Sequence, residues 1–451
     1  MASISSSMAS AAQAMQVLQR SVAVVENNIA NASVANYARQ DQVILANPFL
    51  PASSSQGGIS AGPVRSSRNA AAEAFVWRRQ TAGGHSSQMQ ATLRTLQQSF
   101  PVGQGAGIPA AMDSFFASAS RLSMSPNSTD ARQDLIHHAA TVARSFNQTA
   151  AEVSSLTGAI GAEISPTVNA INRLGAEIAS INAAKGNGSA VDAGLDARLH
   201  SALEELASYT AFSAIPNKDG GMVVSLGGDV PLVIGGRHLP LTVAPQSGQV
   251  SVLDAQGNDV TSRLSGGKLG ALLDARNRVL PSFSAQLDTL AQTFADEVNA
   301  TLAGGLDRNG MPPVQDLFSY DPSLGAAASL RTNDLAPDEI AAAGAADPGG
   351  NSNANRLAQL SSTAVAGGGT LTGMYGAIAS DLGRQLSDQT ARVDSDQQLL
   401  LQAQSFRQEI SGVSIDAEAL KLLDLQRGFE AVGRVIQVLD ELSETVLNML
   451  R

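Results

Sequence analysis

Both ends of this chain carry apolar residues in the same helical repeat, and this repeat constrains the fold more than any other feature of the sequence. Spacings of four and three residues alternate over about four heptads, which is the a/d pattern of a coiled coil. Near the N-terminus the repeat consists of Ile4, Met8, Ala11, Met15, Leu18, Val22, Val25 and Ile29. At the C-terminus it consists of Leu422, Leu425, Phe429, Val432, Ile436, Leu439, Ser443, Val446 and Leu450.

Two terminal stripes of similar length predict that the ends of the chain pack against each other as a coiled coil. The alternative for the N-terminal stripe is an ordinary core helix of a bundle, because such a helix also buries one apolar face. The remaining positions of this helix are Ser, Ala, Gln and a few charged residues. The helix therefore needs a partner along a narrow seam.

Composition excludes several classes of function. The chain has 451 residues, enough for two or three domains, and no cysteine, so neither disulfides nor thiolate chemistry is available. The net charge of −11 disfavours non-specific binding to nucleic acid. No apolar run is long enough to span a bilayer. The first 19 residues contain no basic residue and no continuous apolar segment, so an ordinary secretory signal peptide is not expected.

The sequence between the terminal repeats is mainly helical. Residues 41–68 contain several Pro and Gly residues and predict an extended or loop-like connector. Helical periodicity follows over residues 70–100, with an expected break at Gly83 and Gly84. The segment "SPNSTD" supplies N-cap residues for a long helix, in which the pair Ser165–Pro166 predicts a break or a new first turn.

A β-rich insert interrupts this helical pattern. Short strands are expected at residues 222–226, 231–234, 239–243 and 250–253, separated by pairs of glycines. The predicted fold is therefore mainly α, with a terminal coiled coil, a long helical bundle and a small antiparallel β domain inserted into it. The predicted domains are residues 1–45 with 411–451, residues 46–210 with 263–410, and residues 211–262.

Several segments resemble one known family in order along nearly the whole chain. "NNIANASVANYARQ" follows the first helix, and "SGVSIDAEALKLLDLQRGFEAVGRVIQVLDELSETVLNML" ends the chain. The internal segments are "LDARLHSALEELASY", "GGKLGALLDARN", "FADEVNATLAGGLDRNG" and "DPGGNSNANRLAQL". Together they resemble the flagellar hook-associated protein 1 family, the hook–filament junction proteins. Asn36 stands where that family usually has Gly, but Asn tolerates the left-handed region, so a turn is still expected.

The resemblance implies a structural subunit of the bacterial flagellum, exported unfolded through the flagellar type III apparatus without a cleaved signal. It implies self-association in a junction ring, contacts with the hook protein and a second junction protein, and an export chaperone on the C-terminal helix. It implies no nucleic-acid partner, no membrane insertion and no cofactor. The implied subunit-interface residues are Met8, Met15, Leu18, Val22, Val25, Asn28, Ile29, Asn31, Tyr37, Leu422, Leu425, Phe429, Val432, Ile436, Leu439, Val446 and Leu450.

The sequence offers no pattern that predicts catalysis or a metal site. The adjacent His137 and His138 point about 100° apart on a helix, and no carboxylate stands at a zinc-ligand spacing from them. "DRNG" at residues 307–310 lacks the later carboxylate of a calcium loop, so a turn is expected. Two alternatives remain open. One is another axial protein, such as flagellin or a hook or rod subunit. The other is an extracellular cell-wall hydrolase, for which the irregular region 304–352 offers only scattered carboxylates.

Overall fold

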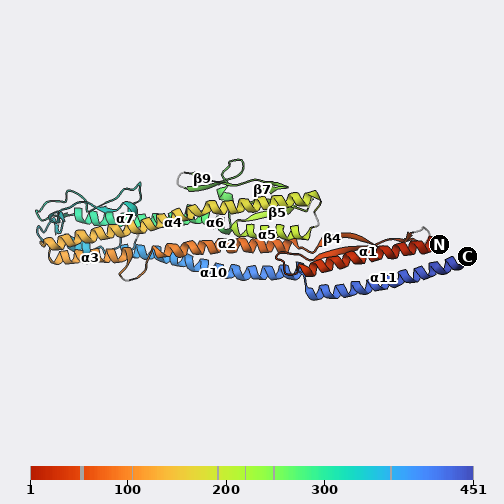
Figure 1. Ribbon diagram of the computed structural model, residues 1–451. Coiled ribbons are helices and arrows are strands. Elements are labelled where there is room, and N and C mark those ends of the chain that lie inside the picture. Colours follow the sequence, from red (N-terminus) through yellow and green to blue (C-terminus); the bar gives the residue numbers. More distant parts are fainter. Residues whose placement is uncertain are drawn as a thin grey trace.

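The computed structural model describes residues 2–50, 55–103, 105–189, 192–218, 220–246, 249–365 and 368–449. The molecule is elongated, with a thick body at one end and a thinner arm at the other (Figure 1). The N- and C-termini lie side by side at the tip of the arm. The prediction of a mainly α fold with small antiparallel sheets is confirmed.

The arm consists of two terminal helices and a β-hairpin. Helices α1 (Ala2–Ala30) and α11 (Ile415–Met449) run antiparallel. The hairpin packs on α1 and pairs β1 (Gln40–Ala46) with β4 (Ile59–Ser66), and it is extended by the short pair β2 (Phe49–Leu50) and β3 (Ser55–Gln56). The expectation of a loop-like connector here is therefore wrong. The backbone is extended, but its hydrogen-bonding groups are paired between strands, which the Pro and Gly content alone did not reveal.

The body is a bundle of long helices that wraps an aromatic core. Rings of Phe115, Phe116, Phe146, Phe294 and Phe318 contact one another with centroids 5.3–6.2 Å apart. The helices of the body are α2 (Ala70–Gln98), α3 (Gly107–Met124), α4 (Thr129–Ala184), α5 (Ala193–Tyr209), α6 (Gly267–Asp274), α7 (Leu280–Ala303), α8 (Ala326–Ser329), α9 (Ser352–Gln359) and α10 (Leu371–Ser411).

Two predicted helix breaks do not occur. Helix α2 continues through Gly83 and Gly84, and a Cβ built on Gly84 would lie 2.4 Å from the carbonyl oxygen of Ser208 on α5. This glycine therefore allows two helices to approach closely instead of ending one. Helix α4 continues through Pro166. The neighbouring Ile164 and Val168 are buried, and their packing offsets the roughly 3 kcal/mol that an internal proline costs a helix.

The β insert lies along α4. Its main sheet has the antiparallel order β5 (Phe212–Pro216), β6 (Met222–Leu226), β7 (Val230–Ile234) and β8 (Arg237–His238), and β9 (Thr242–Gln246) pairs with β10 (Gln249–Leu253). Strand β5 was not predicted, and the strand expected at residues 239–243 begins later. The side chain of Asn182 on α4 bonds to the backbone of Met222 and Gly235, so the insert and the bundle share one core.

Residues 304–352 are irregular, as expected, with two short strand pairs. These pair β11 (Gly305–Leu306) with β14 (Ala343–Gly344), and β12 (Phe318–Ser319) with β13 (Arg331–Thr332). The buried guanidinium of Arg132 on α4 donates to the carbonyl oxygens of Pro126 and Ile340. The side chain of Arg132 thus attaches this irregular segment to α4 of the bundle.

Candidate assembly interface

The heptad residues of α11 form one half-buried stripe that faces α1. In the C-terminal helix the half-buried heptad residues are Leu422, Leu425, Phe429, Val432, Ile436, Leu439, Ser443 and Val446. In the N-terminal helix Val25 is buried, and Ile4, Met8, Ala11, Met15, Leu18, Val22 and Ile29 are half-buried. Leu450 lies outside the described residues. Helices α1 and α11 contact each other, as the two matching stripes predicted.

Two glycines of α11 face α1 across the contact between the terminal helices. A Cβ on Gly428 would lie 3.7 Å from a methyl group of Leu18, and one on Gly433 would lie 3.9 Å from the terminal methyl of Met15. These pairs, together with Asn28 and Glu418, fix the antiparallel register. The heptad analysis missed Val17 and Ser21, which are buried in α1. Because α1 packs on the hairpin as well as on α11, it buries a wider face than one heptad stripe.

The Asn-rich segment after α1 builds a buried polar junction. Asn28 is fully buried, and both the oxygen and the nitrogen of its side-chain amide form hydrogen bonds. Oδ1 accepts from the backbone N–H of Gln40 (2.9 Å) and the hydroxyl of Tyr37 (3.0 Å). Nδ2 donates to the carbonyl of Gln40 (2.8 Å) and to Oε2 of Glu418 (3.0 Å). Burial, followed by the charge of Glu418, raises the pKa of Tyr37 to about 12. The hydroxyl therefore remains a donor at physiological pH.

Nearby residues end the helix and turn the chain. Asn31 donates from its side chain to the carbonyl oxygen of Asn27, one turn back (2.8 Å). Asn36 adopts a φ of 59° and is the one non-glycine residue with positive φ among those described. The predicted turn at Asn36 is confirmed. Lys421 on α11 then pairs with Asp41 of β1 (2.7 Å), which fastens the hairpin to the second helix.

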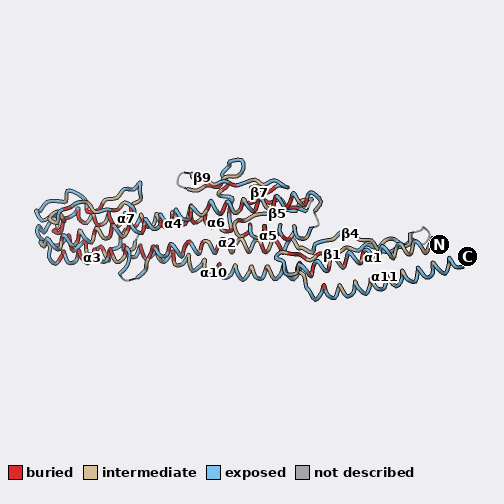
Figure 2. Tube along the Cα trace, in the orientation of Figure 1, coloured by how far each residue is buried: buried red, intermediate tan, exposed pale blue. Residues whose placement is uncertain are grey.

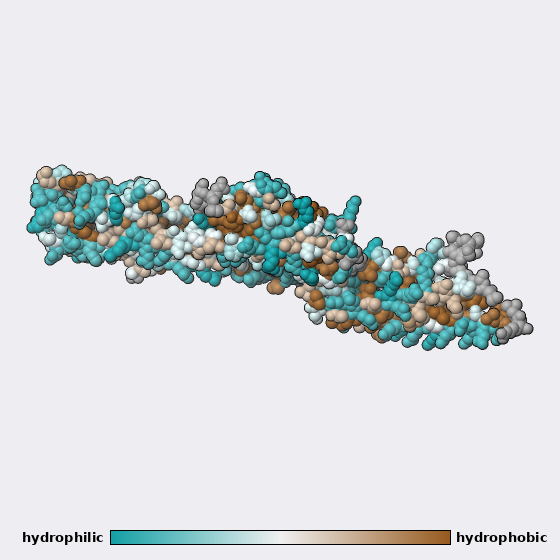
Figure 3. All heavy atoms as spheres, turned by 45° about the horizontal axis from the view of Figure 1, so that its top comes forward, coloured by the Kyte–Doolittle hydropathy of each residue, from teal (hydrophilic) through white to brown (hydrophobic). Residues whose placement is uncertain are grey.

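A second apolar stripe on α11 faces outward. Val435, Val438, Leu442 and Met449 share this face and are all about half exposed or more. Figure 2 shows little buried surface along the arm, and Figure 3 shows apolar residues gathered on it. A groove of about 360 Å³ between the helices is lined by Gln19, Val22, Gln426, Phe429 and Glu430. The arm thus presents apolar surface that the single chain does not cover.

The described residues contain no group of His, Asp and Glu arranged to hold a metal ion. In the same parts of the chain, no helix is long and apolar enough to cross a bilayer. Asp307 accepts hydrogen bonds from the backbone of Asn309 and Met311 (both 2.8 Å), so "DRNG" forms the expected turn.

The chain is thus an elongated, mainly helical protein whose terminal helices pair in an arm beyond the helical body. A family model described as "Flagellar hook-associated protein FlgK helical domain" matches residues 93–318, and one described as "Flagellar basal body rod FlgEFG protein C-terminal" matches residues 404–449. The chain therefore belongs to the flagellar hook-associated protein 1 family, and its role is structural, in the external bacterial flagellum.

Individual relatives agree with this assignment. The chain is 23% identical to flagellar hook-associated protein 1 of Bacillus subtilis over 493 residues, covering 97% of each protein. It is 27% identical to the Salmonella typhimurium protein of the same name, over 68% of this chain and 58% of that protein. The solved structure of the flagellar hook junction protein FlgK from Burkholderia pseudomallei has the same fold, with a TM-score of 0.67 and 16% identity. The match covers 74% of this chain and all of that one.

Proposed function

We propose that this chain is the subunit that joins hook to filament, and that it assembles through its terminal arm after export by the type III apparatus. The observation that carries the proposal is the outward apolar stripe of α11, which lies beside the stripe already packed on α1. Fully burying a Val or Leu side chain is worth roughly 1.5–3 kcal/mol, so covering the half that is still exposed stabilises an assembly by roughly 1 kcal/mol for each. Several such side chains on one helix favour packing against neighbouring copies in a ring.

The same surface accounts for the proposed partners. Before export, a chaperone on α11 would cover the stripe and prevent aggregation. After export, the hook protein and a second junction protein would meet the ends of the ring. The acidic chain is unsuited to nucleic acid, and the proposal includes neither membrane insertion nor catalysis.

We also propose a division into three domains. These are a terminal domain, a helical domain and the insert at residues 211–262, whose apolar core is continuous with that of the helical domain. Because β4 pairs with β1 rather than with the bundle, we place the first boundary at residue 66 instead of residue 45. The second boundary stays at residue 411, where α10 ends.

The test is to place a charge on the outward stripe. Leu442→Glu leaves the seam to α1 intact, since Leu442 is 48% exposed, and should prevent incorporation at the hook tip. Glu441→Gln, at the adjacent exposed position, is the matched control and should assemble normally. Export is measured as protein in the medium, and assembly as hook-bound protein by immuno-electron microscopy. Normal incorporation of Leu442→Glu would refute the role of this stripe.

The same microscopy separates the alternatives. Labelling along the filament, the hook or the rod would identify another axial protein. Cell-wall lysis by the purified chain in a zymogram would support the hydrolase. Deletion of the gene should give hooks without filaments if the junction role is right.

A further inference from the structure

Only two chain segments connect the arm to the body in the part of the chain that the structure describes. One runs from β4 to α2 through Ser67, Arg68 and Asn69, and the other joins α10 to α11 at residues 411–414. The main apolar core extends through the body and the insert, from Met89 to Leu382. The buried arm residues Val17 and Val25 lie outside that core. The orientation of the arm therefore depends on the polar contacts at its base.

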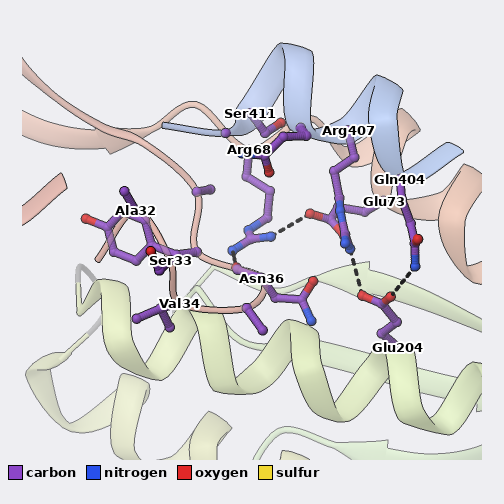
Figure 4. A pocket seen from close by; sticks show the side chains of 15 residues that line it. Ala32, Ser33, Val34, Asn36, Arg68, Glu73, Glu204, Gln404, Arg407 and Ser411 are labelled. Carbon is purple, nitrogen blue, oxygen red and sulfur yellow. Dashed lines mark hydrogen bonds and ion pairs between the residues drawn. The ribbon is translucent and has the colours of Figure 1, made fainter. Parts of the chain in front are cut away.

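Arg68, in the first connection, bonds to three different elements at once. Its Nε donates to Oδ2 of Asp196 on α5 (2.8 Å), and its Nη1 pairs with Glu73 on α2. Its Nη2 donates to the carbonyl oxygen of Asn36, in the turn that belongs to the arm (2.7 Å). Figure 4 shows this guanidinium between the turn and the body. A planar guanidinium with several fixed donors is suited to join three elements in one geometry.

The carboxylates that Arg68 binds have other cations as well. Glu73 is also contacted by Arg407 of α10 (3.4 Å), and Arg407 in turn pairs with Glu204 (2.7 Å). Asp196 accepts from Lys185 (2.9 Å). Burial of Asp196 raises its pKa, but the charges of Arg68 and Lys185 more than offset this, so the pKa is lowered. If Arg68 moved away, neither carboxylate would be left buried without a partner.

Cavities on both sides give this joint room to move. One of about 410 Å³ is lined by residues 32–38 of the turn and by Glu204 and Arg407 of the body. The other, of about 540 Å³, lies between α1, the hairpin and residues 192–194 at the start of α5. Between them, backbone hydrogen bonds from Arg39 to Ser411 (2.9 Å) and from Ser67 to Arg39 (2.8 Å) hold the two connections together. These bonds can act as a pivot, because they lie at the crossing itself.

We propose that Arg68 is a latch that sets the angle between arm and body, and that its release lets the arm turn about the pivot at Arg39 and Ser411. The latch is a property of the single chain and does not depend on the proposed hook–filament role. Polar contacts beside cavities can break and form again without exposing apolar core to water. Separating an apolar contact would expose its side chains. Such a joint would let the arm adapt to its neighbours while the body stays rigid.

The test measures the arm angle in the purified full-length chain. The chain has no cysteine, so Gln398→Cys on α10 and Asp424→Cys on α11 give a unique pair of exposed spin-label sites. Double electron–electron resonance should give a single narrow distance distribution in this labelled parent. Arg68→Gln should broaden the distribution and shift its maximum. Arg121→Gln, which removes the exposed pair with Asp134 inside the body, is the matched control and should leave it unchanged.

A second variant distinguishes a change in arm angle from a loss of folding. Arg68→Lys keeps the positive charge but cannot reach three elements, so it should also broaden the distribution while circular dichroism stays that of the parent. Distributions that superimpose on the parent for both variants would overturn the proposal. So would a loss of helical signal in both, because Arg68 would then hold the body together instead of orienting the arm.

Discussion

The side-chain amide of Asn28 donates a 3.0 Å hydrogen bond to Oε2 of Glu418, a residue 390 positions further along the chain. Both side chains are buried, so this bond joins the first helix to the last in a place that water does not reach. A polar pair in an otherwise apolar seam fixes register, because any shift of one helix along the other would leave both groups unsatisfied.

Replacing Asn28 should therefore loosen the arm while the body stays intact. Asn28→Ala leaves Glu418 and the Gln40 backbone without this partner, at a cost of about 1–3 kcal/mol for each buried group left unsatisfied, while the Tyr37 hydroxyl keeps its hydrogen bond to Oδ1 of Asn27 (2.9 Å). Hydrogen exchange should become faster in α1 and α11 but not in α4. Asn31→Ala, which loses only a local bond within one turn, is the control. Equal exchange in the two variants would contradict the proposed role of the buried junction.

Leu439 should matter both to the arm and to assembly. It is half-buried against α1, so Leu439→Glu places a carboxylate in the seam and should weaken arm packing by roughly 1–3 kcal/mol. The melting transition of the body should not change, but hook-bound protein after export should fall sharply. Glu441→Gln, off the seam, should behave like the parent. If Leu439→Glu still decorates the hook tip, the paired terminal helices are not the assembly element.

The two adjacent glycines of α2 should respond in opposite ways to alanine. At Gly84 a methyl group would lie 2.4 Å from the backbone oxygen of Ser208, so Gly84→Ala should destabilise the body by about 1–3 kcal/mol through overpacking. At Gly83 the nearest atom would be 3.9 Å away, so Gly83→Ala should stabilise the helix by roughly 0.5–1 kcal/mol. Urea unfolding of both variants measures the difference. A stabilising Gly84→Ala would show that α2 and α5 do not approach as closely as described.

His200 should make the body sensitive to mild acid. Burial, with the nearby Arg68, lowers its pKa from 6.5 to about 3, and its ring stacks on Trp77 with centroids 5.8 Å apart. The neutral ring forms no ion pair with Glu73, although Nδ1 lies 3.8 Å from that carboxylate. The unfolded chain takes up a proton below pH 6.5 and the folded chain does not. Above pH 6.5 this residue does not lower the free energy of unfolding. As the pH falls from 6.5 towards 3, the free energy of unfolding decreases.

The measurement is the unfolding free energy between pH 7 and pH 4. One histidine should contribute a slope of about 1.4 kcal/mol per pH unit in this range. His200→Gln should reduce the slope, and His137→Gln, at an exposed position, should leave it unchanged. Equal slopes for the parent and His200→Gln would show that the ring is protonated in the folded chain.

Local patterns predicted the helices and the seam between the chain ends. The heptad positions from Leu422 to Val446 form the half-buried stripe, and Ser128 caps α4 through the N–H of Ala131. These features depend on periodicity and on chemistry within a few residues, which a sequence displays directly. The order of quoted segments along the chain likewise indicated the family before the fold was known.

Other features depend on residues far apart in the chain, and only the tertiary structure decided them. Gly84 was interpreted as a helix break because its neighbour Ser208 is more than a hundred positions away. Residues 41–68 were expected to form an extended or loop-like connector, and not a hairpin, because the pairing of β1 with β4 and their packing on α1 leave no local signature. Arg68 belongs to no sequence pattern, since it is a single arginine among polar residues. Glu73 is only five positions away, but the bonds to Asn36 and Asp196 exist only because folding brings these distant residues to Arg68.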